Sequence, residues 1–182
     1  MYQLIIYGPP GVGKGTQAEL IASKLKLEHI STGAILRKAF EDKTELGIKA
    51  KEIMDKGELV PDEIMNGIVK ECMRNINSGG FILDGYPRTL KQAKALSEIF
   101  AELDYTHVKV INIIADDNEI TKRLLLRGRS DDTEETIANR IKVYYDSTAP
   151  VKKYYDDLGL TIDINGIGEI EDINKKILSL IS

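Results

Sequence analysis

Short apolar runs alternate with helix-like sequence along the chain. The first run contains β-branched residues and closes at a Gly-Pro-Pro-Gly turn, which predicts a buried strand. Five runs that alternate with helical pattern predict an α/β fold of three layers, in which helices cover both faces of a five-stranded parallel sheet. The candidate strands are Tyr2–Tyr7, Leu27–Ile30, Phe81–Leu83, Val108–Ala115 and Leu160–Ile164.

Helical periodicity predicts the segments that join these strands. From about Lys14 to Leu25, apolar residues recur at helical spacing and define one buried face. Thr32–Pro61 is also helical in pattern and carries a stop signal at Lys56-Gly57. We therefore interpret Thr32–Pro61 as a helical addition to the core.

A second addition precedes the last strand. Gly128–Asp132 is a polar break that follows helical Asn118–Arg127. A longer helix begins at Thr133, with Asp132 or Thr133 as its cap, and Pro150 should break or kink it. The chain is thus expected to carry two small insertions on one core.

Composition fits an ordinary globular protein. The chain has 182 residues, of which 42% are hydrophobic and 30% charged, and this excludes wholesale disorder. Its 25 basic and 29 acidic residues give a net charge of −4, which argues against a protein that coats DNA or RNA.

The first residues, the lengths of the apolar runs and the cysteine count argue against several other classes of protein. Tyr2–Tyr7 leads directly into a glycine-rich turn rather than a cleavage site, so no signal peptide is predicted. No apolar run is long enough to span a membrane. The single cysteine, Cys72, excludes an intramolecular disulfide and a four-thiolate zinc site. We expect a cytoplasmic protein.

Gly8–Thr16 (GPPGVGKGT) has the pattern of a phosphate-binding loop. It follows a predicted strand and opens a predicted helix, which is the context that such a loop requires. Its glycines let successive N–H groups point at one anion, and the helix N-terminus adds a positive end. Lys14 can reach the β- and γ-phosphates of a nucleotide, and Thr16 can face a magnesium ion.

Three segments resemble the nucleoside monophosphate kinase family, the adenylate kinases among them. In the phosphate loop, Gly15 separates the lysine from the hydroxyl of Thr16 (GKGT), and Gln17 continues the resemblance. Ser31–Arg37 (STGAILR) resembles the segment that holds the nucleoside monophosphate. Gly79–Arg88 (GGFILDGYPR) resembles the family's most characteristic signature, and the likeness extends from Tyr2 to the last helix.

The resemblance implies an adenylate kinase of the short-lid type, in the three-layer fold of the P-loop nucleoside triphosphate hydrolases. Its reaction is the reversible, Mg²⁺-dependent transfer of the terminal phosphoryl group from ATP to AMP, giving two ADP. We expect a monomer whose partners are ATP, AMP and ADP, with no nucleic acid, membrane or structural zinc. The implied single domain spans 1–182, with a core of 1–30, 61–126 and 134–182, a lobe for the monophosphate at about 31–60, and a lid at about 127–133.

The resemblance also assigns site residues. The catalytic set is Lys14, Arg88, Arg127, Arg129 and Arg140. ATP-binding residues are Gly11, Val12, Gly13, Lys14, Gly15, Thr16, Arg123, Arg127 and Gly168. AMP-binding residues are Thr32, Arg37, Glu58, Leu59, Val60, Gly85, Tyr86, Pro87, Arg88, Gln92, Arg129 and Arg140, and Mg²⁺ is held, mostly through water, by Thr16 and Asp84.

Elementary chemistry agrees with this assignment. Asp84 follows a predicted buried strand, and ligands bind at the carboxyl ends of strands in open α/β sheets. Six of the seven arginines, all but Arg74, fall at the implied contacts, and the guanidinium fork matches phosphate oxygens. The phosphate oxygen of a nucleoside monophosphate is already anionic, so no strong base is needed, and we expect structural roles for His29 and His107.

The choice of base leaves alternatives open. A threonine at Thr32 and a glutamine at Gln92 accompany adenine recognition in the family, and a glutamine amide can donate to and accept from the adenine edge. One alternative is a kinase for UMP or CMP. Another is a non-catalytic nucleotide switch, although the chain has no NKxD element for guanine.

The lid and the metal site carry two particular expectations. Asp131 and Asp132 resemble the family's acidic pair beside the lid arginines, a hinge and helix cap. Ala34 departs from the family, which usually has a carboxylate there, so Asp84 is expected to be the sole carboxylate near the metal.

Overall fold

The fold is a five-stranded parallel sheet with helices on both faces, as predicted. The computed structural model describes residues 1–77, 79–129 and 131–181. All four strand pairs are parallel, and the strand order is β2-β3-β1-β4-β5. The strands are β1 (Tyr2–Tyr7), β2 (Glu28–Ser31), β3 (Gly80–Asp84), β4 (Val108–Ile114) and β5 (Thr161–Asn165).

Side chains of the three central strands enter two separate cores, one on each face of the sheet. In β1, Leu4 and Ile6 pack with α1 (Lys14–Leu25) and α9 (Ile170–Ile181) on one face of the sheet. Ile5 packs on the other face, against a second group of helices. Because both faces are covered, the central strands are apolar at almost every position.

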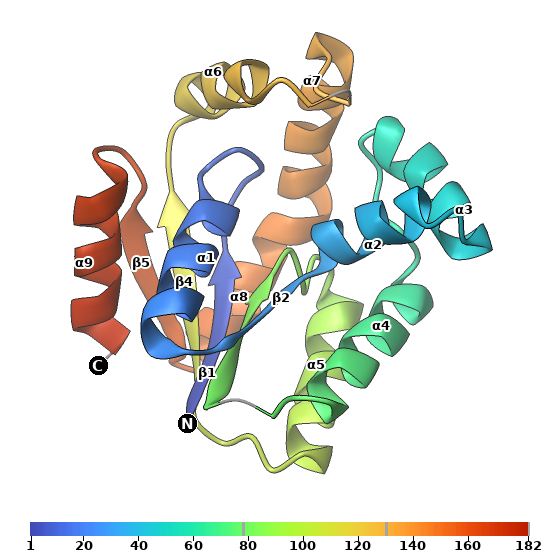
Figure 1. Cartoon of the computed structure of the whole chain (residues 1–182). Coiled ribbons are helices and arrows are strands. Elements are labelled where there is room, and N and C mark those ends of the chain that lie inside the picture. Colours follow the sequence, from blue (N-terminus) through green and yellow to red (C-terminus); the bar gives the residue numbers. More distant parts are fainter. Residues whose placement is uncertain (78, 130, 182) are drawn as a thin grey trace.

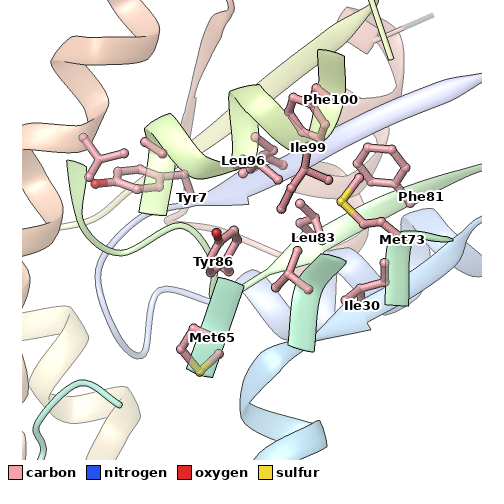
Figure 2. Packing of buried hydrophobic residues seen from close by; sticks show 14 of the residues in the cluster. Tyr7, Ile30, Met65, Met73, Phe81, Leu83, Tyr86, Leu96, Ile99 and Phe100 are labelled. Atoms are coloured by element: carbon pink, nitrogen blue, oxygen red, sulfur yellow. The ribbon is translucent and has the colours of Figure 1, made fainter. Parts of the chain in front are cut away.

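Three helices cover the second face. These are α4 (Asp62–Arg74), α5 (Leu90–Glu102) and α8 (Ala149–Asp157). Figure 2 shows Met73 of α4 and Ile99 of α5 meeting Phe81 and Leu83 of β3. Phe81 stacks on Phe100 of α5 with ring centroids 5.9 Å apart, which fixes α5 against the sheet.

The remaining helices stand over the carboxyl ends of the strands (Figure 1). They are α2 (Thr32–Glu41), α3 (Glu45–Asp55), α6 (Asp117–Arg127) and α7 (Glu134–Val143). The helical addition predicted at 32–61 is therefore two helices, because Lys43 adopts a left-handed conformation between them and Thr44 caps α3 by accepting from the Gly47 N–H.

The second predicted addition also differs in detail. Thr133, rather than Asp132, caps α7, since its hydroxyl accepts from the Thr136 N–H. Of the polar break 128–132, position 130 lies outside the described residues. The interruption expected at Pro150 comes earlier, as a π-helical turn at Tyr144–Thr148, and Pro150 then lies in the first turn of α8.

Within the described ranges, no helix has the length and apolar character needed to cross a membrane.

Candidate active site

A cavity of about 820 Å³ lies at the carboxyl ends of the strands. It is lined by residues from the β1–α1 loop, α2, the β3–α5 loop, α6, α7 and the loop after β5. All residues predicted for the nucleotide and metal sites line it except Thr32, Val60 and Gln92. These three line a small adjoining cavity that shares Gly33, Met54, Glu58, Leu59, Gly85 and Arg88 with the large one.

The β1–α1 loop is shaped to hold an anion. Gly13 is the N-cap of α1 with φ +103°, and Gly11 has φ +79°. A Cβ on Gly11 would lie 2.6 Å from Cγ of Leu124 in α6, so only glycine fits there without displacing α6. The Lys14 ammonium folds over the loop and donates to the carbonyls of Gly8 (2.9 Å) and Pro9 (2.7 Å). The loop therefore holds its lysine at the N-terminus of α1.

Lys14 and Asp84 form the charged floor of the cavity. Burial lowers the pKa of Lys14 to about 8, opposed by Asp84 and assisted by Arg88 and Arg127, so the ammonium remains protonated at pH 7. Burial would raise the pKa of Asp84, but His29, Lys14 and Arg88 outweigh it and hold that pKa below its ordinary value. Both groups are thus charged where a nucleotide phosphate would lie.

Asp84 ends β3 and is held by β2. The Ser31 hydroxyl donates to Oδ2 of Asp84 at 3.3 Å, and Nε2 of His29 lies 3.7 Å from the same oxygen. The structure thus places His29 inside the cavity, where the sequence indicated only a structural role. The sequence feature that could have indicated this is the position of His29 two residues before Ser31, on a strand that pairs with β3.

The donor set suits a loosely held magnesium ion. A Cβ on Gly15 would lie 3.5 Å from Oδ2 of Asp84, so the carboxylate faces the phosphate loop, and Thr16 lines the same cavity. One ionised carboxylate and one hydroxyl, beside a site for phosphates, match the way Mg²⁺ is usually bound, with several waters retained.

The small cavity contains the predicted base-reading pair. The Thr32 hydroxyl donates to the Gly85 carbonyl at 3.0 Å, and the Thr32 side chain is buried. Gln92 is 2% exposed, so it is no surface helix residue. Its Oε1 accepts from the Arg88 N–H at 2.7 Å and its Nε2 donates to Oδ1 of Asp62 at 2.8 Å.

These two contacts determine the orientation of the Gln92 amide. Because the Arg88 N–H needs an acceptor and the Asp62 carboxylate needs a donor, the amide can face only one way. One donor hydrogen and one acceptor lone pair remain for a ligand. Asp62 was missed by sequence reasoning, because an acidic residue in the first turn of a helix ordinarily serves the helix dipole.

Arg88 is anchored within its own turn. Its Nε donates to the Gly85 carbonyl at 2.8 Å, and burial, with Arg140 and Arg37 nearby, lowers its pKa while Asp84 opposes the shift. Gly85 has φ +82°, and a Cβ there would lie 2.9 Å from the Thr32 hydroxyl and 3.1 Å from the Arg88 guanidinium. Glycine at this position therefore lets Thr32 and Arg88 approach each other.

On the opposite side of the cavity, Arg123 joins two loops. Its NH1 donates to the carbonyls of Val12 (3.2 Å) and Gly166 (3.0 Å), and its Nε donates to Glu119 at 2.6 Å. The phosphate loop and the loop after β5 are thereby held together beside Gly168.

One carboxylate organises the lid arginines. Asp132 accepts from Nε and NH2 of Arg127 at 2.8 and 2.6 Å, a bidentate pair, and from NH1 of Arg140 at 2.7 Å. Asp131 pairs with NH2 of Arg140. The Arg129 backbone N–H donates to Asp132 at 3.3 Å, and burial lowers the pKa of the Arg129 side chain, with Arg127 and Arg37 adding to the shift. The acidic pair therefore orients the arginines instead of capping α7.

The same helix α7 contacts the end of α3. Thr136 donates to the Asp55 carbonyl (3.2 Å), Asn139 to the Lys56 carbonyl (2.6 Å) and Arg140 to the Met54 carbonyl (3.3 Å). Carbonyls in the last turn of a helix lack i+4 partners within the helix, and here the Met54 carbonyl also accepts from the Gly57 N–H at 3.0 Å. Side chains of α7 thus bind the segment that precedes Glu58 and Leu59.

Comparison with known proteins places these features in one family. A family model described as adenylate kinase matches residues 6–160. A protein named adenylate kinase from Leptospira biflexa serovar Patoc is 48% identical over 186 residues that cover all of both chains. A second from Rhodococcus erythropolis is 43% identical over 178 residues, 97% of each chain, and a third from Methanothrix thermoacetophila is 43% identical over 210 residues, 98% of each chain.

Proposed function

The chain belongs to the adenylate kinase family, and from that membership we propose how its residues divide the work of phosphoryl transfer. Its reaction is the reversible transfer of the terminal phosphoryl group of ATP to AMP, and its substrates are ATP, AMP and ADP. The observation that carries the assignment of roles is the single cavity lined by Lys14, Asp84 and six arginines.

The acceptor nucleotide is proposed to enter between α2 and the β3–α5 loop. The adenine of AMP would occupy the small cavity lined by Thr32, Val60 and Gln92, where the free donor and acceptor of the Gln92 amide meet its edge. Arg37 and Arg88 line the large cavity next to it and are proposed to hold the AMP phosphate.

The donor nucleotide is proposed to lie along the phosphate loop. Backbone N–H groups of Gly11–Thr16 and the Lys14 ammonium would hold the ATP phosphates, with the adenine between Arg123 and Gly168. Arg127, Arg129 and Arg140 face the cavity between the two sites. We propose that they neutralise the charge that spreads over the transferring group.

This arrangement needs no strong general base. The attacking oxygen of AMP is anionic at neutral pH, so the chain's task is to align two polyanions and exclude water. Alignment alone supplies about 7–11 kcal/mol in favourable model reactions. The proposed lobes at about 31–60 and 127–133 would perform the exclusion by closing over the cavity.

Adenylate kinases generally use Mg²⁺ with ATP, and we propose that Thr16 and Asp84 hold the ion here, mostly through water. When bound, Mg²⁺ would supply positive charge that offsets that of the phosphates and polarises the transferring group. The monomeric state and cytoplasmic location expected from the sequence stay predictions.

Substituting Ala34 with aspartate is expected to lower the Mg²⁺ concentration for half-maximal rate by about tenfold, because a second carboxylate would hold magnesium-bound water. Ala34 lines the same cavity as Asp84. A magnesium titration at saturating ATP and AMP measures this, with Ala34→Asn as the uncharged control. An unchanged titration would remove the idea that Ala34 loosens the metal site.

A substrate panel tests the proposed base recognition. With ATP as donor, AMP should be turned over at least about tenfold more efficiently than UMP or CMP, because the Gln92 amide would be left mispaired by a pyrimidine. The measurement is kcat/KM in a coupled assay for ADP formation. Equal turnover of UMP would overturn the roles proposed for Thr32 and Gln92.

A further inference from the structure

Tyr7 places a buried hydroxyl between the sheet and the helical turn that follows α7. It is the last residue of β1, directly before the phosphate loop, and is 3% exposed. Figure 2 shows its hydroxyl pointing away from the other labelled core side chains. That hydroxyl donates a hydrogen bond to the backbone carbonyl of Thr148, which is 141 residues away in sequence.

Burial keeps this hydroxyl a donor. Burial raises the pKa of Tyr7 far above its ordinary value, Tyr144 and Tyr155 add to the shift, and a hydrogen bond from the Lys152 backbone opposes it. The phenol therefore stays protonated at neutral pH, and its hydroxyl can donate.

The Thr148 carbonyl belongs to a π-helical turn. Between α7 and α8, residues Tyr144–Thr148 form this turn, closed by the Ala149 N–H donating to the Tyr144 carbonyl. Such turns are rare, and they disturb the regular i→i−4 ladder of a helix. The centroids of the Tyr7 and Tyr144 rings are 6.4 Å apart. Tyr7 therefore meets the first residue of the turn with its ring and the last residue, Thr148, with its hydroxyl.

The side chain of Thr148 contacts Arg88, a residue of the proposed acceptor site. Its side-chain hydroxyl donates to the backbone carbonyl of Arg88 at 2.9 Å, and Thr148 is 7% exposed. The Arg88 N–H is already bound by Gln92. Both backbone polar groups of Arg88 are thus held by side chains, one from α5 and one from the π-helical turn.

We propose that Tyr7 and Thr148 are positioning residues for Arg88: the Tyr7 hydroxyl fixes the π-helical turn, and the Thr148 hydroxyl fixes the turn that carries the Arg88 guanidinium. The inference rests on the proposed role of Arg88 in holding the AMP phosphate. It links the strand that carries the donor loop to the residue that reads the acceptor phosphate.

Removing one hydroxyl tests the first contact. Tyr7→Phe keeps the ring and is expected to raise the Kd and KM for AMP about fivefold, the loss of one buried hydrogen bond, with KM for ATP unchanged. Tyr155→Phe is the matched control, since Tyr155 is 2% exposed and its hydroxyl has no hydrogen-bond partner among the described residues. Direct AMP titration by calorimetry, without ATP, gives the Kd.

Thr148 variants test the second contact. Thr148→Val removes the hydroxyl and is expected to weaken AMP binding about fivefold, whereas Thr148→Ser retains the hydroxyl and should restore it. Because Tyr7 acts through Thr148, the Tyr7→Phe/Thr148→Val pair should weaken AMP binding no more than the more damaging single change. Additive losses would overturn the relay.

Two outcomes separate the inference from the proposed function. If Arg88→Ala weakens AMP binding strongly while Tyr7→Phe behaves like Tyr155→Phe, the positioning role is wrong and the role of Arg88 stands. If Arg88→Ala leaves AMP binding unchanged, the proposed acceptor site itself is wrong. Equal increases in KM for AMP and ATP in Tyr7→Phe would also overturn the inference, because they indicate a general distortion.

Discussion

Replacing Lys14 with methionine is expected to lower kcat about 10³-fold while the protein stays folded. Lys14 is the basic residue that the phosphate loop itself supplies, and its ammonium lies against the carbonyls of Gly8 and Pro9. When ATP is bound, the same ammonium would move onto the phosphates, where charge grows in the transition state.

The size of the effect follows from burial. Burial lowers the pKa of Lys14 to about 8, which means that few waters screen its charge. A charge in such surroundings interacts more strongly with phosphate than an exposed one. Methionine keeps most of the side-chain volume but removes the charge and both hydrogen bonds to the loop.

The measurement is kcat by coupled assay with thermal unfolding of the same samples. Lys94→Met, at an exposed position of α5, is the matched control and should retain full activity. A Lys14→Met protein that keeps more than about a tenth of the wild-type kcat would contradict the electrostatic role of this lysine.

Contiguous motifs were predictable because their chemistry is local. The apolar runs gave four of the strands to within a residue or two, and Leu27–Ile30 is shifted by one, to Glu28–Ser31, because Ser31 pairs in register with Asp84. The phosphate loop requires only a strand, glycines and a helix N-terminus in sequence order, so Gly8–Thr16 could be identified directly.

Contacts between distant segments could not be predicted from the chain alone. The pairing of Gln92 with Asp62 spans 30 residues, and that of Arg140 with the Met54 carbonyl spans 86. From the sequence, Tyr7 looked like an ordinary strand residue, because the carbonyl that its hydroxyl contacts, that of Thr148, lies 141 residues away. The partners of such residues become neighbours only when the chain folds, so no local sequence pattern identifies them.

The charge of the cavity differs from the net charge of the chain. The net charge of −4 is an average over the whole chain and hides the local charge of the cavity. Six arginines and one lysine line it, together with the carboxylates of Glu19, Glu58, Asp84 and Asp131. In the structure, the acidic pair Asp131 and Asp132 neutralises part of this positive charge by pairing with Arg127 and Arg140. A phosphate that binds Arg127 or Arg140 would therefore have to compete with these carboxylates for the same guanidinium groups.

Replacing Arg140 with alanine is also expected to have a large effect and to lower kcat about 10³-fold. Arg140 is the residue that lines the cavity, pairs with both lid carboxylates and donates to the Met54 carbonyl of α3. Alanine would remove the charge proposed to face the transferring group and also a contact between α7 and α3. Among the described residues, Asp132 would then keep one side-chain partner, Arg127.

A lysine at this position distinguishes charge from geometry. Arg140→Lys keeps the charge but cannot bind two carboxylates and a carbonyl through one planar fork, so kcat should fall to an intermediate level. Arg74→Ala is the matched control, because Arg74 pairs with Glu102 on the outer surface and should leave kcat unchanged. If Arg140→Lys matches the wild type, charge alone accounts for the role of Arg140, and if Arg140→Ala also does, the residue has no part in transfer.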